Sequence, residues 1–293
     1  MSTEWEDRAR RAHERRERLE AFGPNAVGLF VEAKTGLFVV DPEDSSVSAQ
    51  LLQCGEYAPD EIGLVSRFIR GGDVLVVGSH IGAHVVVLSR ISKRLVAIEA
   101  NPRTFKLLSA NIRLNELKNV EAYNVAAGED GGTIPFVLNR ENSGGSKRMP
   151  TAKHMHYFYD DPEVIEVDMV ALDDLINRRE FDIILMDIEG SEYFALKGMP
   201  ELLERAGAVA IEFLPHHLID VSGVTPEQFV EPLIEFFEWL YIPQGNLIIP
   251  KEQIVHKMRQ MYDAGEGHDL IVFSKERPVD ASFLGTNLCA TAL

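Results

Sequence analysis

Short apolar runs alternate with segments of helical period from residue 73 onward. The runs typical of buried strands are residues 74–77, 95–99, 120–125, 181–187, 208–214 and 268–274. Helices are expected between them, near residues 81–92, 103–116, 191–205, 226–239 and 251–263. Strands that are apolar along their whole length are buried on both faces, and parallel strands need a crossover to connect them. The pattern therefore predicts an α/β fold, in which a mostly parallel sheet has helices on both faces.

The residues before this alternation have a different character. Residues 4–21 mix acidic and basic side chains and favour a solvated helix. Residues 27–40 hold two β-rich runs around Lys34-Thr35-Gly36, which predicts a hairpin, and residues 60–69 again have a helical period. We therefore expect a lead-in of helix, hairpin and helix over residues 1–70, a main domain over 71–276, and a poorly ordered tail over 277–293.

A polar insertion at about residues 139–162 separates two further predicted strands, 133–138 and 163–170. It is basic and aromatic in an otherwise acidic chain, and its notable residues are Lys147, Arg148, Lys153, His154, His156, Tyr157 and Phe158. Loops at the edge of a sheet often close over a substrate. We expect a substrate lid here, which would attract an anionic or sugar-like molecule. A mobile solvated loop is the alternative.

The charge and hydropathy of the chain exclude several classes of protein. Contact with phosphates needs a basic surface, so the net charge of −17 argues against a nucleic-acid binder. No run approaches the ~18 uncharged residues that a membrane helix needs. The first twenty residues are densely charged and lack the apolar centre of a secretory signal. We expect a cytoplasmic protein. The apolar stretch LIEFFEWLYI (233–242) would either cover the sheet or form a homodimer face.

The end of the first predicted strand carries a glycine pair in "VLVVGSHIGAH". Gly78 and Gly82 let the backbone pass close to a ligand at the start of the next helix. Glu99 ends the next strand, 21 residues after Gly78, where an acidic side chain can accept the hydroxyl protons of a ribose. A helix-capping role for Glu99 with Asn101 is the alternative. The dinucleotide fingerprint G-x-G-x-x-G is absent. A nucleoside without pyrophosphate points to S-adenosylmethionine.

Several blocks of the chain, taken in order, resemble the FkbM-type methyltransferase family. They are "GEYAPDE", "GDVLVVGSHIGAH", "VAIEANPRTFKLLSANIRLNELKNV", "NVAAGEDGG", "VALDDL" and "IILMDIEGSEYFALKGM". The resemblance runs from about residue 27 to 214, and the last block is the most specific. It implies a Rossmann-like class I methyltransferase fold and S-adenosylmethionine as the methyl donor, with S-adenosylhomocysteine as product. The implied acceptor is a hydroxyl of a small molecule, such as a sugar or a polyketide-type natural product.

The resemblance also implies the residues that would hold the donor. On the matching positions it places Gly78, Ser79, His80 and Gly82 against the methionine part, Glu99 on the ribose, Ala100 and Asn101 beside the adenosine, Val125 and Ala126 on the adenine, and Tyr57 near the donor from the N-terminal segment. The chain departs from the family at Val76, where an aspartate is usual, and at Ser79-His80, where the family usually has Ala-Asn. A missing charged hydrogen bond at Val76 would cost about 1–3 kcal/mol of donor binding.

Three carboxylates surround one glycine in "MDIEGSE". Asp187 ends a predicted parallel strand and should emerge at the same edge as Gly78 and Glu99. An alcohol needs a general base within hydrogen-bond reach, so Asp187 is expected either to take its proton or to anchor the ammonium of the donor. Glu189 is expected to do whichever of these Asp187 does not. Glu192 suits the positive end of the following helix.

The histidines give further candidates. His216 or His217 is a reserve candidate for the base, because both follow the strand at 208–214. His80 and His84 have a spacing that can hold a metal, but we expect local packing and no metal site. Two other functions stay open: a catalytically silent methyltransferase-like scaffold, motivated by Val76, and methylation of a nitrogen or a carboxylate.

Overall fold

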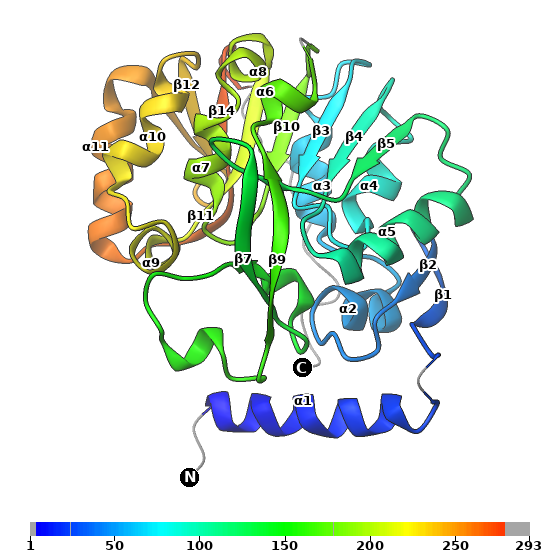
Figure 1. The fold of residues 1–293 in the computed structure, drawn as a ribbon. Helices are drawn as coiled ribbons and strands as arrows, with labels where there is room; N and C mark the ends of the chain where they lie inside the picture. The colour runs from blue at the N-terminus through cyan, green and yellow to red at the C-terminus, as the bar shows by residue number, and fades with distance from the viewer. Residues whose placement is uncertain (1–3, 24, 178, 279–293) are drawn as a thin grey trace.

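The computed structural model describes residues 4–23, 25–177 and 179–278. Most of the tail predicted to be poorly ordered, from residue 279 on, lies outside these residues. The described strands form three sheets, and the largest has eight strands in the order β13-β12-β14-β11-β10-β3-β4-β5. Figure 1 shows this sheet through the centre of the molecule, with helices to either side.

The central sheet confirms the predicted fold class. Its parallel part consists of β11 (Ala208–Phe213), β10 (Ile183–Met186), β3 (Val74–Val77), β4 (Leu95–Ile98) and β5 (Val120–Tyr123). The antiparallel part consists of β14 (His268–Ser274), β12 (Trp239–Ile242) and β13 (Leu247–Pro250). Because β3 lies between β4 and β10, the strand order reverses at β3. Ligands of open α/β sheets bind at such a reversal, beyond the carboxyl ends of the strands.

The side chains of β3 alternate between two cores. Leu75 and Val77 belong to the core on one face of the sheet, and Val74 and Val76 belong to the core on the other. The first face is covered by α6 (Leu172–Leu175), α7 (Glu192–Lys197), α8 (Pro200–Arg205), α10 (Pro226–Ile234) and α11 (Lys251–Ala264). The second is covered by α3 (Pro59–Ser66), α4 (Ala83–Leu88) and α5 (Pro102–Leu114). This burial on both faces explains why the strands are apolar along their whole length.

The structure contains strands that were not predicted, such as β12 and β13, and it changes two of the predicted helices. The helix expected at 226–239 ends at Ile234, and residues 239–242 form β12, which pairs with β14. The stretch LIEFFEWLYI is therefore largely part of the sheet and its cover, since Leu240 and Ile242 are fully buried. The helix expected at 191–205 is two helices, because Gly198 and Pro200 interrupt it.

A second sheet carries the polar insertion. Its order is β6 (Ala126–Ala127), β9 (Glu163–Val170), β7 (Gly132–Leu138) and β8 (Lys147–Arg148). The strands β7 and β9 pair along their whole length and extend away from the central sheet in Figure 1. The insertion that joins them contains two 3-10 turns, η1 (Ser143–Gly145) and η2 (Met155–Tyr157).

The expected N-terminal helix and hairpin are both present. They are α1 (Glu4–Glu20) and the pair β1 (Leu29–Ala33) and β2 (Gly36–Val40), followed by α2 (Val47–Cys54). Asn111 of α5 and Asn115, the residue that follows this helix, join the hairpin to the domain. The carboxamide of Asn111 bonds the backbone of Val39, and that of Asn115 bonds the backbone of Leu37. Asn111 also donates to the carbonyl of Ile81, which fixes the hairpin beside the glycine turn.

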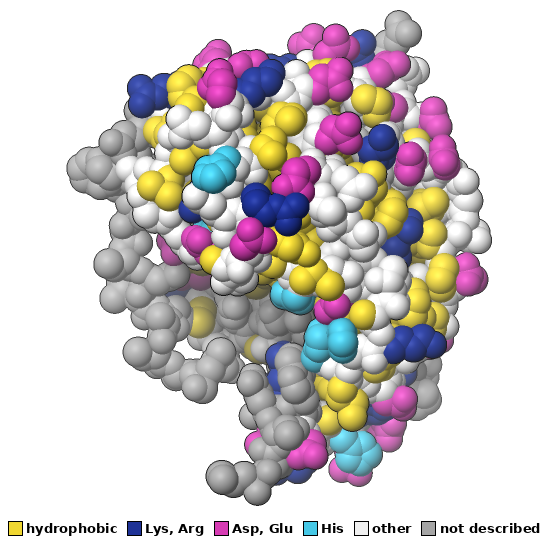
Figure 2. All heavy atoms as spheres, turned by 90° about the vertical axis from the view of Figure 1, so that its left-hand side faces the viewer, with side chains coloured by type: hydrophobic (Ala, Val, Ile, Leu, Met, Phe, Trp, Pro, Cys, Tyr) yellow, Lys and Arg dark blue, Asp and Glu magenta, His cyan; other side chains and the backbone are white. Residues whose placement is uncertain are grey.

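Helix α1 lies against the insertion rather than against a core, and it crosses the lower side of the molecule in Figure 1. Its contacts are polar: Arg8 pairs with Glu141 at 3.0 Å, and Arg16 donates to the carbonyl of Asp160 at 3.1 Å. Within the described residues, no helix combines the length and the apolar character needed to cross a membrane. On the face shown in Figure 2, hydrophobic side chains are interspersed with acidic and basic ones.

Candidate active site

A cavity of about 200 Å³ opens at the carboxyl ends of β3, β4 and β10, at the reversal of the strand order. Nine of the residues predicted to bind the donor line it: Tyr57, Gly78, Ser79, His80, Glu99, Ala100, Val125, Ala126 and Asp187. Glu189 also lines this cavity. The structure therefore brings together side chains from four strand ends and from the N-terminal segment. We name this the first cavity.

The turn after β3 depends on the absence of a side chain at Gly78. Its φ is +90°, and a Cβ built on it would lie 1.7 Å from the carbonyl oxygen of Asp187. The next turn residue, His80, also has a positive φ, of +48°. Its backbone N–H donates to Glu99 Oε2 at 2.7 Å. The turn is therefore held against both the end of β10 and the end of β4.

Glu99 helps to cap the start of α5, which was the alternative interpretation of this residue, and it also lines the first cavity. Its Oε1 accepts from the backbone of Asn101 at 2.8 Å and from the hydroxyl of Thr104 at 2.9 Å. With the bond from His80, three of the roughly four lone-pair sites of the carboxylate are used. Oε2 can therefore accept one further hydrogen bond, for example from a hydroxyl of the ribose. Capping and ribose binding are therefore compatible.

Two predicted donor residues do not line the first cavity. Gly82 starts α4 with a φ of +92°, and a Cβ there would lie 2.8 Å from Leu108. Asn101 caps α5 by accepting from Arg103, and its side chain is buried. Both residues shape the elements that carry the cavity, and their contacts with the donor stay predictions.

Val76 does not reach the first cavity. Its side chain is 1% exposed and lies in the core between the sheet, α3 and α4. A different carboxylate, Glu61 of α3, lines the cavity instead, and its Oε2 lies 3.3 Å from His84 Nε2. The sequence interpretation missed Glu61, because only the fold brings α3 over the glycine turn. His80 and His84 have separate partners, since His80 Nε2 lies 2.7 Å from the hydroxyl of Ser143.

A second cavity of about 270 Å³ adjoins the first, and Asn142, Glu189 and Glu212 line both. Its other lining residues are Arg8, Asn139, Gly145, Lys147, His156, Tyr157, Tyr159, Leu214, His216 and His217. Leu214 is the one aliphatic side chain among them. The insertion 139–162 supplies about half of this wall, in the position expected of a lid.

Carboxylates crowd the junction of the two cavities. One ligand atom of each of Asp187, Glu192 and Glu212 lies within 4.8 Å of the others. Asp187 is exposed to the cavity but enclosed by protein, and desolvation together with the charge of Glu189 raises its pKa well above the ordinary value. Burial likewise raises the pKa of Glu192 to about 7 and that of Glu212 well above its usual range. The site therefore favours an incoming positive charge.

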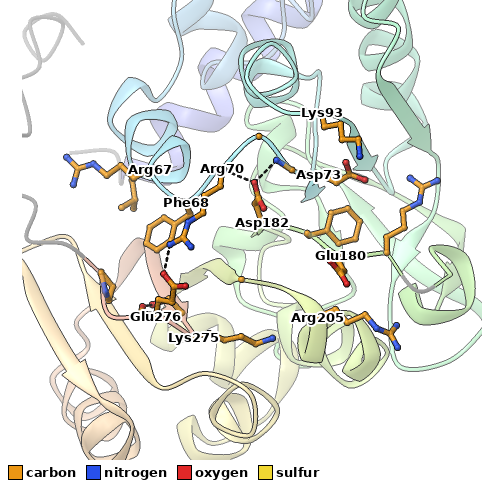
Figure 3. Close-up of a pocket in the computed structure, with 18 of the residues that line it drawn as sticks. Arg67, Phe68, Arg70, Asp73, Lys93, Glu180, Asp182, Arg205, Lys275 and Glu276 are labelled. Carbon is orange, nitrogen blue, oxygen red and sulfur yellow. Dashed lines mark hydrogen bonds and ion pairs between the residues drawn. The ribbon is translucent and has the colours of Figure 1, made fainter.

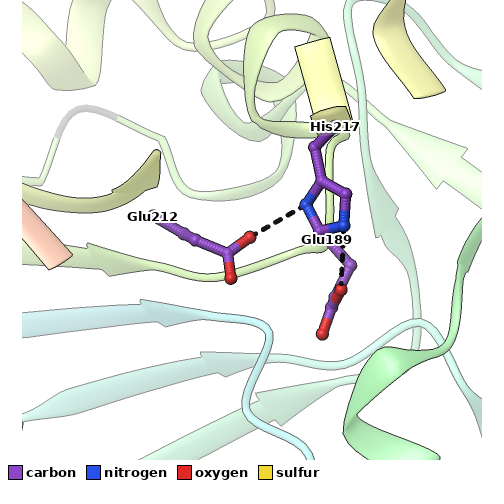
Figure 4. Close-up of side chains that lie close together, drawn as sticks. All are labelled: Glu189, Glu212 and His217. Atoms are coloured by element: carbon purple, nitrogen blue, oxygen red, sulfur yellow. Dashed lines mark hydrogen bonds and ion pairs between the residues drawn. The ribbon is translucent and has the colours of Figure 1, made fainter. Parts of the chain in front are cut away.

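Four side chains form a contiguous polar network on the side of the second cavity. Lys147 Nζ donates to Glu189 Oε2 at 2.8 Å and lies 3.4 Å from His217 Nε2. His217 Nδ1 lies 3.1 Å from Glu212 Oε2, and its Nε2 lies 3.4 Å from Glu189 Oε2. Figure 4 shows the imidazole between the two carboxylates. Burial and the charge of Lys147 lower the pKa of His217 to about 2, so the ring is neutral.

His216, the predicted reserve base, lies in the same cavity but outside this network. Its side chain is exposed, and its ring contacts are with His217, at a centroid distance of 4.4 Å, and with His156, at 6.4 Å. Burial lowers the pKa of His216. The structure therefore separates two adjacent histidines that the sequence could not distinguish.

The methyltransferase FkbM domain model matches residues 77–242, more than half of the chain. The chain belongs to the FkbM methyltransferase family. A search of curated proteins finds no match.

The chain is also similar to solved methyltransferases. The FkbM methyltransferase from Methylobacillus flagellatus is 17% identical over 78% of this chain and 52% of its own, with a TM-score of 0.38. M. jannaschii TYW2 in complex with AdoMet is 16% identical over 65% of this chain and 64% of its own, at 0.35. Precorrin-6y C5,15-methyltransferase from Geobacter metallireducens is 11% identical over 84% of this chain and 100% of its own, at 0.41. The chain spans less than two thirds of the first two structures.

This FkbM-family chain has a third and larger cavity, of about 930 Å³, at the opposite edge of the sheet. Figure 3 shows its charged lining. Two ion pairs lie within this lining: Arg70 with Glu276 at 2.6 Å, and Arg94 with Asp73 at 3.7 Å. Asp182 accepts from the backbone of Arg70 and Gly72. Because this cavity lies at the amino ends of the parallel strands, it is not the expected ligand crevice of the fold.

Proposed function

We propose that this chain is an S-adenosylmethionine-dependent O-methyltransferase that acts on a hydroxyl of a small molecule. The observation that carries the proposal is the junction of the two cavities at Glu189 and Glu212. A displacement at a methyl carbon needs donor and acceptor in line and in contact. Two cavities that meet at a cluster of proton-accepting side chains provide that arrangement.

In this proposal the first cavity holds the donor. The ribose binds Glu99, the adenine lies by Val125 and Ala126, and the methionine part runs along the turn from Gly78 to His80. The ammonium faces Asp187, with Glu61 as a second carboxylate on the same cavity. The positive sulfonium and ammonium would compensate the crowded carboxylates, which otherwise repel one another. These carboxylates take the place of the acidic residue that the family usually has at position 76.

The second cavity holds the acceptor. Its volume is about 270 Å³, and a small acceptor or one end of a larger one would occupy it. The hydroxyl, imidazole and carboxamide groups of its wall favour a polar, hydroxyl-bearing acceptor such as a sugar. A cytoplasmic location, the absence of a nucleic-acid partner and a homodimer stay predictions. The net charge of −17 supports the second of these.

The test is isothermal titration of S-adenosylhomocysteine into the wild type, Glu99→Gln and Glu129→Gln. Glu129 is exposed and lines neither cavity, so it is the matched control. We expect binding by the wild type and the control, and binding at least tenfold weaker by Glu99→Gln. A wild type that does not bind S-adenosylhomocysteine at millimolar concentration would support the silent scaffold instead.

A further inference from the structure

We propose that His217 takes the proton of the acceptor hydroxyl and that Glu212 positions its ring. This inference rests on the proposed function, because it assigns the base of that reaction. Glu212 lies near the end of β11, His217 ends α9 (Pro215–His217), and Glu189 follows β10, so three separate elements meet at one imidazole. His217 is 3% exposed, yet it lines the acceptor cavity.

The contacts of the ring select its tautomer. A neutral imidazole has one N–H and one acceptor nitrogen. Nε2 lies 3.4 Å from both Lys147 Nζ, which can only donate, and Glu189 Oε2, which already accepts from Lys147 at 2.8 Å. We assign the lone pair to Nε2 because the closer ring contact, that of Nδ1 with Glu212, takes the N–H. The N–H is then on Nδ1, from which it donates to Glu212 at 3.1 Å. Glu212 thereby directs the basic nitrogen toward Glu189 and the acceptor cavity.

The proposed step is balanced in atoms and charge. A lone pair of the acceptor oxygen forms the C–O bond to the methyl carbon, the C–S bond breaks, and its electron pair leaves on sulfur as a neutral thioether. The hydroxyl proton moves to His217 Nε2. The resulting imidazolium lies between Glu212 and Glu189, whose carboxyl oxygens lie 3.1 Å from Nδ1 and 3.4 Å from Nε2 and can accept from its two N–H groups. The hydroxyl becomes more acidic as the C–O bond forms, so a weakly basic imidazole suffices at that stage.

The same three side chains would suit a divalent cation, since their ligand atoms lie within 4.8 Å of one another. The arrangement in Figure 4 favours the base instead. Each carboxylate contacts a different nitrogen of the ring, whereas one ion would have to be bound through a single nitrogen on one edge. Lys147 also supplies a positive charge at Glu189, within 2.8 Å.

Nitrogen-15 NMR of the histidine rings tests the tautomer without any knowledge of the acceptor. The spectra are recorded on the full chain with S-adenosylhomocysteine, and His217→Gln assigns the signal. We expect His217 to be the Nδ1–H tautomer throughout pH 6–8. In Glu212→Gln the carboxamide can donate, so the Nε2–H form should appear; the exposed control Glu252→Gln should leave the spectrum unchanged. An Nε2–H ring or an imidazolium in the wild type would overturn the proposal.

Two further measurements, NMR with added manganese and kcat of a His217 variant, distinguish a base from a metal ligand. Added MnCl₂ at micromolar concentration should leave the His217 signal sharp, and selective broadening of that signal would show a metal site and overturn the assignment of His217 as the base.

With a methyl glycoside that the wild type methylates, His217→Gln should lower kcat about 10²–10⁴-fold and leave the affinity for S-adenosylhomocysteine within twofold. The exposed control His256→Gln should leave kcat unchanged. If the wild type binds no S-adenosylhomocysteine, the proposed function fails, whereas normal binding with the wrong tautomer overturns this inference alone.

Discussion

Gly78 and Asp187 are in direct contact across two neighbouring strands: a Cβ on Gly78 would lie 1.7 Å from the carbonyl oxygen of Asp187. The backbone of the glycine turn and the strand end with the acidic cluster therefore fix each other's position. Any side chain at residue 78 must displace one of them, and with it the first cavity.

Gly78→Ala is therefore expected to destabilise the protein by much more than the backbone strain at residue 78 would cause. Gly71 is the matched control, because its φ of +84° is also left-handed but a Cβ there meets nothing within 4 Å. Gly71→Ala should lower the free energy of unfolding by about 1–2 kcal/mol. Gly78→Ala should lower it further and abolish binding of S-adenosylhomocysteine, as measured by urea unfolding and titration. Equal losses in the two variants would contradict the contact.

The stability of the free protein should fall as pH rises from 5 to 7.5. Burial raises the pKa of Glu192 to about 7 in the folded protein, against 4.5 unfolded. Between these values the folded state holds a proton that the unfolded state has lost, so the free energy of unfolding decreases with pH. In Glu192→Gln the decrease should be shallower, as measured by urea unfolding at several pH values. The same slope in both proteins would show that Glu192 ionises normally.

Donor binding should have the opposite pH dependence. Asp187 and Glu212 also have raised pKa values, owing first to burial, and the donor brings two positive charges. Its affinity should therefore increase with pH, and more so for S-adenosylmethionine than for S-adenosylhomocysteine, which lacks the sulfonium charge. Titration of both ligands at pH 6 and pH 8 measures this. An affinity ratio between the two ligands that does not change with pH would contradict the proposed role of the carboxylates.

Arg8 of helix α1 should contribute to binding of the acceptor. Arg8 lines the second cavity, pairs with Glu141 and lies over the ring of Tyr159. Glu141 is buried but also accepts from Ser45 and Tyr159, so Arg8→Gln leaves its carboxylate with two donors and should cost about 1–3 kcal/mol of stability. The KM for the acceptor should rise severalfold, while Arg10→Gln, whose side chain is 66% exposed, should change neither quantity. An unchanged KM would mean that α1 does not border the acceptor.

Restoring the family's aspartate at position 76 should harm the protein. Val76 is buried in the core between the sheet and α3, so Val76→Asp places a charge without a partner in an apolar region. We expect more than about 3 kcal/mol of destabilisation, with Val76→Thr as the milder control.

Glu61→Gln, in contrast, should weaken S-adenosylmethionine binding, whereas Asp60→Asn, at the exposed neighbouring residue, should leave this binding unchanged. A stable Val76→Asp protein with tighter binding would reverse this account.

Much of the fold was predictable, because parallel strands of the central sheet such as β3, β4 and β10 are continuous apolar runs in the sequence. Residues 74–77 and 163–170 were predicted with the observed bounds. The first strand is fully buried and wholly apolar, whereas the second is mostly exposed or half-buried and combines β-branched residues with three acidic ones. β12 was not predicted as a strand, and only its first residue, Trp239, was placed in the expected helix 226–239. A short aromatic run fits both periods, and only pairing with β14 decides.

The site was predictable where function falls on a strand end and unpredictable where it depends on tertiary contact. Asp187 and Glu99 follow from the rule for parallel sheets, and both line the first cavity. Glu61 carries no local signal, because α3 reaches the first cavity only through folding. Glu212 lies near the end of the predicted strand 208–214, so the same rule could have found it. The choice of His217 over His216 depends on which ring α9 turns inward, which spacing does not reveal.

A crystal structure with S-adenosylhomocysteine tests the central claim most directly. The account predicts the ribose hydroxyls within hydrogen-bond distance of Glu99, the homocysteine along the turn from Gly78 to His80, and the sulfur at the junction that Glu189 and Glu212 share. A ligand seated elsewhere, or one whose sulfur points away from the second cavity, would contradict it.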